Sequence, residues 1–513
     1  MKVLFSTLRN RAHLRRSGFW RASVKMVKDF TFCKYLSAGL VLLFVFIYNA
    51  GGMTEDQLFK CLEDKDYDHL LAMIDKGLPQ TQRPKHVTII EASDRIGGRI
   101  MTYRNKKEGW YAELGAMRIP SFHKILLLMG QRLGLEFGKF IQDDRNTYYL
   151  INGLLHKTYQ VKQNPDVLNY PVYDWERGKS ASELFDIALA KLRDDLEKMG
   201  CEKMMTTYDS YSVKGKYKSS PKSMQGKSKS NILNENSFYY TALTEMLYVQ
   251  SDISDNQMYY EFKGGFQTFT DAFYGVLNST ILQSAKVTSI SQTADNVTVT
   301  FQDWRNRGAL TDITGDYVLV TTTAKAALFT EFTPPLSAEK MEALRSVHYS
   351  SSTKVVLSFS ERFWENNDRI KGGKSITDRL SRFIYYPSHE FPGISGGAVL
   401  ASYTCSDDAS LLQTVDEKEL QELVLNDLTK IHGEGIRNLY TGGVVKKWGL
   451  DPYSHGAFAI FTPFQMRDYS VSLFQNEGRI HFAGEHTARP HGWIETAIKS
   501  ALRAAEKINN NVH

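Results

Sequence analysis

The fold expected for this chain depends on one stretch, His86-Val-Thr-Ile-Ile-Glu-Ala-Ser-Asp-Arg-Ile-Gly-Gly-Arg99. Its β-branched run predicts a strand that ends on Glu91. A carboxylate at the end of such a strand can accept hydrogen bonds from both ribose hydroxyls of an adenine dinucleotide. The Gly97-Gly98 pair lets a ligand approach the backbone, and Arg99 can meet a pyrophosphate. A plain β-turn after the strand would show the same sequence pattern.

A second stretch lies near the other end and reads Arg479-Ile-His-Phe-Ala-Gly-Glu485, followed by His491-Gly-Trp493 and a helical pattern. The strand predicted over Arg479–Gly484 leads into a helix from Trp493 with one stripe of small and apolar residues, which can pack close to a sheet or a flat ring. The N-terminus of this helix suits a developing anion such as the N1–C2=O edge of a reduced flavin. An ordinary terminal helix is the alternative. The stripe comprises Ile494, Ala497, Ile498, Ala501, Leu502 and Ala505.

Composition excludes several classes of protein. The chain has 513 residues, of which 42% are hydrophobic and 23% charged, so it can bury a large core and is neither disordered nor a disulfide scaffold. The net charge of +6 is local, because residues 1–50 contribute +8 and residues 210–230 contribute +6. The remaining chain carries −8, and we therefore expect no nucleic-acid partner.

The N-terminal 50 residues have the layout of a secretory signal. A thirteen-residue apolar run, Leu36–Tyr48, follows Lys34 and other basic residues and precedes small residues. A membrane-spanning helix needs roughly 18–20 apolar residues, so the run is short for a span. We expect a secreted protein with a cleaved signal. An uncleaved membrane anchor is the alternative, and a lysosomal location is a further one.

Cysteines and sequons fit an oxidising compartment. Cys33 lies in the presequence, so Cys61, Cys201 and Cys405 remain, and one disulfide between Cys61 and Cys201 is the simplest arrangement. Asn278 and Asn296 begin N-glycosylation sequons. No CxxC motif or His/Cys cluster argues for a metal.

Strand and helix patterns alternate along the rest of the chain, which indicates an α/β core with inserted segments. Strands are expected at Val297–Phe301, Tyr317–Thr321 and Thr353–Phe359. A helix is expected over residues 180–200, with Leu184, Ile187, Ala188 and Leu192 on one face. Residues 210–230 are rich in Ser, Lys and Gly and read as a solvated loop.

Six segments in order resemble the flavin-dependent amine oxidases, and most closely the secreted vertebrate L-amino-acid oxidases. Besides Glu91–Arg99 and the C-terminal stretch, they are Gly109-Trp-Tyr-Ala-Glu-Leu-Gly-Ala-Met-Arg118, Leu344-Arg-Ser-Val-His-Tyr, Ser381-Arg-Phe-Ile-Tyr-Tyr and Phe461-Thr-Pro-Phe. The resemblance runs from about Cys61 to Ile508. It implies an interleaved α/β (α+β) fold, with a glutathione-reductase-like FAD/NAD(P)-binding domain, a mixed-sheet substrate domain and a helical insert.

The apolar run and the amphipathic pattern that follows it place a signal or anchor at 1–50 and an N-terminal helical segment at 51–83. The resemblance implies the remaining bounds, beginning with a partial FAD-binding segment at 84–118. Further parts are a substrate-domain part at 119–155, a helical domain at 156–255, an FAD-binding part at 256–345, a substrate domain at 346–472 and a C-terminal FAD-binding segment at 473–513.

Roles are implied residue by residue, with FAD as cofactor. Arg118 would clamp the substrate carboxylate with a bidentate pair, which an amino-acid oxidase needs and a simple amine oxidase lacks. Tyr403 would share that carboxylate, Lys354 would hold a water at flavin N5, and Gly492 and Trp493 would form the carbonyl and aromatic wall at the substrate amine. The cofactor contacts implied are Glu91, Arg99, Gly115, Arg118, Val287, Glu485, Trp493, Ile494 and Thr496, and the implied disulfide is Cys61–Cys201.

One departure from the family pattern is severe. The family reads strand, G-x-G-x-x-G, helix and second strand, whereas here Pro84-Lys-His-Val87 runs directly into Thr88-Ile-Ile-Glu91. Roughly 20–25 residues, the whole phosphate-binding loop with its helix, are missing by comparison with a βαβ unit, and no G-x-G-x-x-G stands elsewhere. A skipped exon, a gene-model error or a non-flavin isoform would look alike.

These observations favour an FAD-dependent L-amino-acid oxidase that acts on a small-molecule L-amino acid and O2. It would release a 2-oxo acid, ammonia and hydrogen peroxide, and we expect a homodimer that meets a membrane only if the N-terminal segment stays uncleaved. The alternatives are an impaired isoform or paralogue that acts as a binding protein, or a monoamine or polyamine oxidase. Val249 stands where some members carry a histidine, so no general base is assigned, and Phe458 and Cys405 fall near the expected substrate pocket.

Overall fold

The computed structural model describes residues 64–76, 86–215, 239–253, 255, 257–277 and 279–510. The expected signal at 1–50, Cys61, Asn278 and most of the Lys/Ser-rich segment lie outside these residues. No helix within the described ranges is long and apolar enough to cross a membrane.

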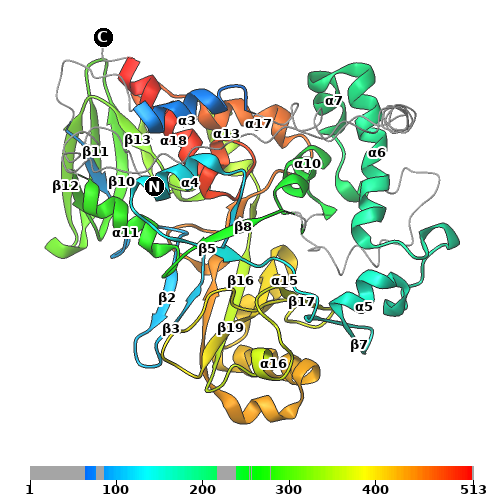
Figure 1. Cartoon of the computed structure of the whole chain (residues 1–513). Helices are drawn as coiled ribbons and strands as arrows, with labels where there is room; N and C mark the ends of the chain where they lie inside the picture. The colour runs from blue at the N-terminus through cyan, green and yellow to red at the C-terminus, as the bar shows by residue number, and fades with distance from the viewer. Residues whose placement is uncertain are drawn as a thin grey trace, which may run out of the picture.

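A seven-stranded sheet forms the lower half of the molecule in Figure 1. Its neighbouring strands are antiparallel except for the one parallel pair that the two short strands β17 and β6 make. Every residue of β16, the second strand of this sheet, is buried, and α16 (Glu417–His432) packs against it. The strand order is β20 (Tyr440–Lys447), β16 (Ser352–Phe359), β19 (Gly397–Cys405), β18 (Phe383–Tyr385), β17 (Lys374–Thr377), β6 (Tyr148–Ile151) and β7 (Leu154–Lys157).

Two parallel strand pairs in the upper half stand apart from any larger sheet among the described residues. β1 (Thr88–Ile90) pairs with β9 (Thr280–Leu282), and β13 (Val318–Val320) pairs with β22 (Ile480–Phe482). Among the described residues no strand joins the two pairs into one sheet. Beside them stands a four-stranded sheet in the order β12 (Ala309–Gly315), β11 (Val297–Asp303), β10 (Ala285–Gln292) and β14 (Glu331–Thr333).

Smaller sheets connect these halves. They are the hairpin β2 (Thr102–Asn105) and β3 (Trp110–Glu113), the sheet β4 (Ile119–Pro120), β8 (Tyr259–Phe262) and β5 (Phe137–Phe140), and the pair β15 (Tyr349–Ser350) and β21 (Phe458–Ala459). The mixed strand orientations confirm the expected α/β fold with interleaved segments.

The C-terminal helix α18 (Ile494–Asn510) organises the upper half, where it contacts α3 (Tyr67–Lys76), α4 (Lys124–Arg132) and β22. Its small-residue stripe divides in two. Ile498 and Leu502 are buried in a core shared with α3, α4 and α11 (Gln267–Val276), whereas Ala497 and Ala501 face a cavity. The remaining helices of this half are α12 (Ala324–Ala327), α13 (Ala338–Ser346) and α17 (Gln465–Phe474).

Helices α6 (Ala181–Met199), α7 (Cys201–Tyr208) and α10 (Leu243–Asp252) form a separate group on the right of Figure 1. Helix α6 confirms the helix expected over 180–200, but the expected buried face is partly wrong. Leu184 and Leu192 are buried, whereas Ile187 is 47% exposed. The first residues of the expected solvated loop also pack, since Val213 is buried and Ser212 bridges to Ala242.

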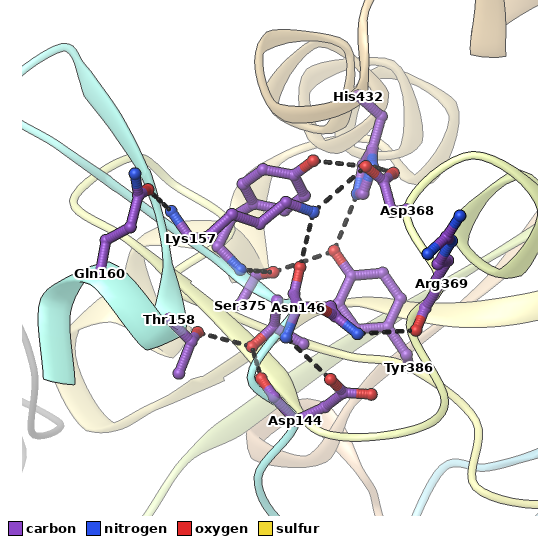
Figure 2. Close-up of polar contacts among 12 residues, drawn as sticks. Asp144, Asn146, Lys157, Thr158, Gln160, Asp368, Arg369, Ser375, Tyr386 and His432 are labelled. Carbon is purple, nitrogen blue, oxygen red and sulfur yellow. Dashed lines mark hydrogen bonds and ion pairs between the residues drawn. The ribbon is translucent and has the colours of Figure 1, made fainter. Parts of the chain in front are cut away.

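A buried polar cluster ties the end of the seven-stranded sheet together, as Figure 2 shows. Asp368 lies 2.7 Å from Nδ1 of His432, whose Nε2 lies 2.8 Å from the Tyr386 hydroxyl, and that hydroxyl lies 3.0 Å from Ser375 Oγ. Lys157 Nζ donates to Asp368 at 3.3 Å. The cluster thereby joins β7, β17 and α16 to the ends of α14 (Phe363–Asn366) and α5 (Thr158–Gln163). Elsewhere in this half, helix α15 (Ser406–Leu411) directly follows β19.

Candidate active site and cofactor cleft

A cavity of about 620 Å³ runs between the two parallel strand pairs and the top of the seven-stranded sheet. It is large enough for a cofactor or drug-sized ligand. Most of the site residues predicted from sequence line it, namely Glu91, Arg99, Gly115, Val287, Lys354, Tyr403, Glu485, Gly492, Trp493 and Ile494, together with Phe458. Arg118, Thr496 and Cys405 are not among the lining residues.

Glu91 directly follows β1 at one end of the cavity. Its backbone N–H donates to Leu282 O at 2.7 Å, which fixes the residue at the strand end, and its Oε1 accepts from Ser93 N and Oγ at 3.1 and 3.0 Å. Glu91 O accepts from Ala285 N at the start of the strand that carries Val287. The structure therefore brings Glu91 and Val287, two of the expected cofactor contacts, to the same end of the cavity.

The Gly97-Gly98 turn contributes only backbone atoms to the cavity wall. Gly97 has φ of +104° and Gly98 of +56°, a region that favours glycine. Arg95 holds this turn by donating to Ile96 O at 3.3 Å, Ile100 O at 3.2 Å and Gly98 O. Arg95 lines the cavity and was not singled out from the sequence, although it stands inside the quoted stretch.

Arg99 and Glu485 pair with each other across the cavity wall. Arg99 Nη1 donates to Glu485 Oε1 at 2.6 Å and to Ala457 O at 3.0 Å. Glu485 is 4% exposed and also accepts from the N–H groups of Ala459 and Gly492 at 3.1 and 2.9 Å. Burial acts to raise the pKa of Glu485, but Arg99 and nearby histidines hold it below its usual value. Their expected contacts with the cofactor's phosphates and ribityl chain remain predictions.

Lys354 enters the cavity wall from the fully buried strand β16. Its Nζ donates to Gly115 O at 2.7 Å and to Glu113 O at 3.2 Å, and it lies 4.9 Å from the ring centre of Tyr403. Burial, aided by the charge of Arg118, lowers the pKa of Lys354 to about 8, although Glu113 opposes the shift. Burial raises the pKa of Glu113 to about 7.

Arg118 lies beside the cavity and is electrostatically coupled to Lys354 and Tyr403, which both line it. Its guanidinium donates to Gln142 Oε1 at 3.1 Å and to the Tyr385 hydroxyl at 3.2 Å. Burial acts to lower the pKa of Arg118, but the surrounding tyrosine hydroxyls keep it above its usual value. Among the described ion pairs, none involves Arg118.

Trp493 stands at the start of α18, with its ring edge-on to His123 at 5.0 Å. Gly492 before it has φ of +80°, and a Cβ there would lie 3.4 Å from Phe458. Thr496 is buried and its hydroxyl donates to Pro490 O at 2.5 Å, so it holds the turn before the helix. Thr496 is not among the residues that line the cavity, so its position does not support the expected contact with the cofactor.

The remaining predicted residues lie away from the cavity. Cys201 is disulfide-bonded, but its expected partner Cys61 lies outside the described residues. Asn296 is exposed just before β11, and Cys405 is buried at the end of β19, outside the cavity wall. Residues that the sequence interpretation missed are Thr321, Thr322, Thr323 and Trp448, which line the cavity from loops that follow β13 and β20.

The geometry combines a large cavity at the ends of parallel strands with two cations at or beside its wall, Lys354 and Arg118. A family model for flavin-containing amine oxidoreductases matches residues 78–509, and the chain belongs to this family. An L-amino-acid oxidase of Siganus canaliculatus is 53% identical over 490 residues, with 90% of this chain and 92% of that protein covered. An L-amino-acid oxidase of Echis ocellatus is 38% identical, with 91% and 97% covered.

Solved structures of amine oxidases share the fold. Cyclohexylamine oxidase from Brevibacterium oxydans IH-35A superposes with a TM-score of 0.64 at 16% identity, covering 86% of this chain and 96% of its own. Wild-type putrescine oxidase bound to putrescine gives a TM-score of 0.65 at 15% identity, with the same coverage. At this identity the likeness concerns the fold alone.

FAD is the cofactor of this family, and the cavity fits it at both ends. The adenosine end has the carboxylate of Glu91 and strand β10, and the ring end has Lys354, Trp493 and the N-terminus of α18 with its positive dipole end. The middle of the cleft differs, since no G-x-G-x-x-G loop exists in the sequence to meet the pyrophosphate.

Proposed function

We propose that this chain is an FAD-dependent L-amino-acid oxidase, which converts an L-amino acid, water and O2 into a 2-oxo acid, ammonia and hydrogen peroxide. Family membership and the two L-amino-acid oxidases that align over nine-tenths of the chain support the reaction class. When bound, FAD accepts a hydride from the substrate Cα and passes the electrons to O2.

The guanidinium of Arg118, which is half-buried beside the cavity, is the observation that carries the proposal. A charge withdrawn from water costs free energy unless it is paired, and the hydrogen-bond partners that the described residues give Arg118, Gln142 and Tyr385, are both neutral. A substrate carboxylate would supply the missing counter-charge through a bidentate pair. An amine substrate could not, which argues against a monoamine or polyamine oxidase.

Neighbouring groups would orient the rest of the substrate. Tyr403 lines the cavity on the Arg118 side, so its hydroxyl can share the carboxylate. Gly492 and Trp493 would face the amine from the opposite wall, and Phe458 would limit the side-chain pocket. Lys354, with a pKa of about 8, can hold a proton or a water near the ring end of the cleft.

We further propose a secretory route for the chain. It is supported by the short apolar run at 36–48 behind basic residues and by the disulfide at Cys201, whose expected partner is Cys61. The sequons at Asn278 and Asn296 would carry glycans on that route. The homodimer remains an expectation.

A second candidate function is an impaired, flavin-poor isoform that acts as a binding protein. The specific observation that favours it is the separation of the β1/β9 and β13/β22 pairs, with no phosphate loop in the sequence. The presence of Lys354 and Trp493 in the wall of one cavity, with Arg118 beside it, favours the oxidase.

The test is to replace Arg118 with Lys and to follow peroxide release from L-phenylalanine with excess FAD present. An ammonium lacks the planar fork, so the variant should lose about 1.5–3 kcal/mol of transition-state stabilisation, roughly a ten- to hundredfold fall in kcat/KM. Arg132→Lys is the matched control, because Arg132 pairs with Asp75 at the surface. Equal kinetics in Arg118→Lys and the parent would refute the carboxylate clamp.

A further inference from the structure

Arg118 stands at the end of a hydrogen-bonded chain that reaches the protein surface. Its Nη1 donates to Gln142 Oε1 at 3.1 Å, and Gln142 Nε2 donates to Asp255 Oδ1 at 3.1 Å. Lys374 Nζ donates to the same Asp255 oxygen at 2.5 Å. Gln142 is 6% exposed, while Asp255 is exposed at the outer end.

The partners of Gln142 allow one orientation of its amide. A guanidinium has donors only and an ionised carboxylate has acceptors only, so the amide oxygen must face Arg118 and the amide nitrogen must face Asp255. Burial acts to raise the pKa of Asp255, but Lys374 holds it below its usual value, so the carboxylate stays ionised. The ionised pair therefore fixes the Gln142 oxygen toward Arg118.

The backbone around Gln142 is also fixed. Ile141 N donates to Ser388 Oγ at 2.9 Å, and Ile141 O accepts from Gly373 N at 2.8 Å, directly before Lys374. Two and four residues after Gln142, Asp144 and Asn146 belong to the polar cluster of Figure 2 that also holds Ser375. The cluster therefore fixes the backbone near Gln142 relative to the backbone next to Lys374.

The distribution of charge along this chain matters for substrate binding. Lys374 compensates Asp255 directly, and a neutral amide separates that pair from Arg118. A carboxylate at position 142 would pair with Arg118 and compete with an incoming carboxylate. A neutral acceptor instead holds the guanidinium without consuming its charge.

We propose that Gln142 is a positioning residue that keeps Arg118 oriented but uncompensated, and that it thereby sets the preference for substrates bearing a carboxylate. The proposal rests on the proposed function, because it assigns Arg118 to the substrate carboxylate. It adds a residue outside the cavity wall that would act through Arg118.

The test measures binding of 3-phenylpropanoate, which keeps the carboxylate of phenylalanine and lacks its amine, by calorimetry on the full chain with excess FAD. Gln142→Glu should weaken binding by about tenfold or more, because the introduced carboxylate pairs with Arg118. Gln142→Met removes the acceptor without adding charge, and its effect should be clearly smaller. In turnover of L-phenylalanine, Gln142→Glu should raise KM more than it lowers kcat.

Arg118→Met and Gln131→Glu complete the design, the latter as a charge-matched change at an exposed glutamine of α4. Weak binding in Arg118→Met with parental binding in Gln142→Glu would overturn the role of Gln142 and leave the clamp intact. Equal losses in Gln142→Met and Gln142→Glu would overturn the charge argument. Parental binding in Arg118→Met, or no binding by the parent chain, would count against the proposed function itself.

Discussion

Lys354 in the cavity wall interacts electrostatically with Glu113, which lies outside that wall. Desolvation lowers the pKa of Lys354 from 10.5 to about 8 and raises the pKa of Glu113 from 4.5 to about 7. Glu113 is held by Phe266 N at 2.9 Å and by the Thr102 hydroxyl, so it is fixed by neutral donors rather than by the lysine. Such displaced values are typical of functional sites.

The shift of Lys354 predicts how stability depends on pH. The unfolded chain binds more protons than the folded chain between about pH 8 and 10.5, so this group makes the free energy of unfolding rise with pH across that window. Lys354→Met should remove this rise, about 3 kcal/mol between pH 8 and 10.5. The measurement is urea unfolding of both proteins at several pH values.

Lys263→Met is the control for this experiment, since Lys263 is exposed and pairs with Glu136 at the surface. Its unfolding profile should parallel that of the parent chain. A parent and a Lys354→Met variant with parallel profiles would show that Lys354 keeps an ordinary pKa in the fold.

The N-terminus of helix α4 is capped by a carboxylate from α18, a helix distant in the sequence. His123 at its N-terminus provides no side-chain cap, and Glu495 of α18 accepts instead from the N–H groups of Ile125 and Leu126 at 3.1 and 2.7 Å. The same carboxylate accepts from the Tyr67 hydroxyl of α3 at 2.5 Å. One residue therefore joins three helices below the ring end of the cleft.

Glu495→Ala should destabilise the protein by about 2–4 kcal/mol, because it leaves two buried N–H groups without an acceptor. Chemical unfolding at pH 7 measures the change. Glu506→Ala on the same helix removes only the half-exposed ion pair with His69 and should cost under about 1 kcal/mol. Losses of similar size in the two variants would contradict the capping role.

Local patterns predicted the elements better than their contacts. The β-branched and alternating runs identified β1, β11 and β16, and the small-residue stripe identified α18. Periodicity identified the buried side of α6 through Leu184 and Leu192 but did not predict that Ile187, at the edge of the apolar stripe, is exposed. Gln142 and Glu495 carry no local signal, since their partners stand 24 residues away or more.

Across the whole molecule, the family resemblance supplied what local patterns could not. The resemblance assigned Glu91, Lys354 and Trp493 to one site, and the structure places all three in the wall of one cavity although they are far apart in the sequence. It did not foresee that Arg99 and Glu485 would pair with each other. The interleaved domain bounds remain predictions.

The separation of the parallel strand pairs has a consequence for the cofactor. The cavity is lined on one side by Ile89 and Ile90 of β1 and on the other by residues that follow β13 and β22. In a βαβ dinucleotide site a strand, a glycine loop and a helix N-terminus stand at this place and meet the pyrophosphate. Here Arg99, the cation expected to meet the pyrophosphate, is already paired with Glu485.

Affinity for FAD should therefore be low in the 513-residue chain. Each charge-assisted hydrogen bond to the pyrophosphate is worth about 1.5–3 kcal/mol, so losing three weakens binding by about a thousandfold or more. After gel filtration, the chain should show far less than one flavin per protein by absorbance. A family-like strand, glycine loop and helix inserted between Val87 and Thr88 should restore a stoichiometric flavin band, because it supplies the missing N–H donors and pairs the open strand edges. A stoichiometric band in the unmodified chain would mean that Glu91, the Arg99–Glu485 pair and the start of α18 suffice to hold the cofactor.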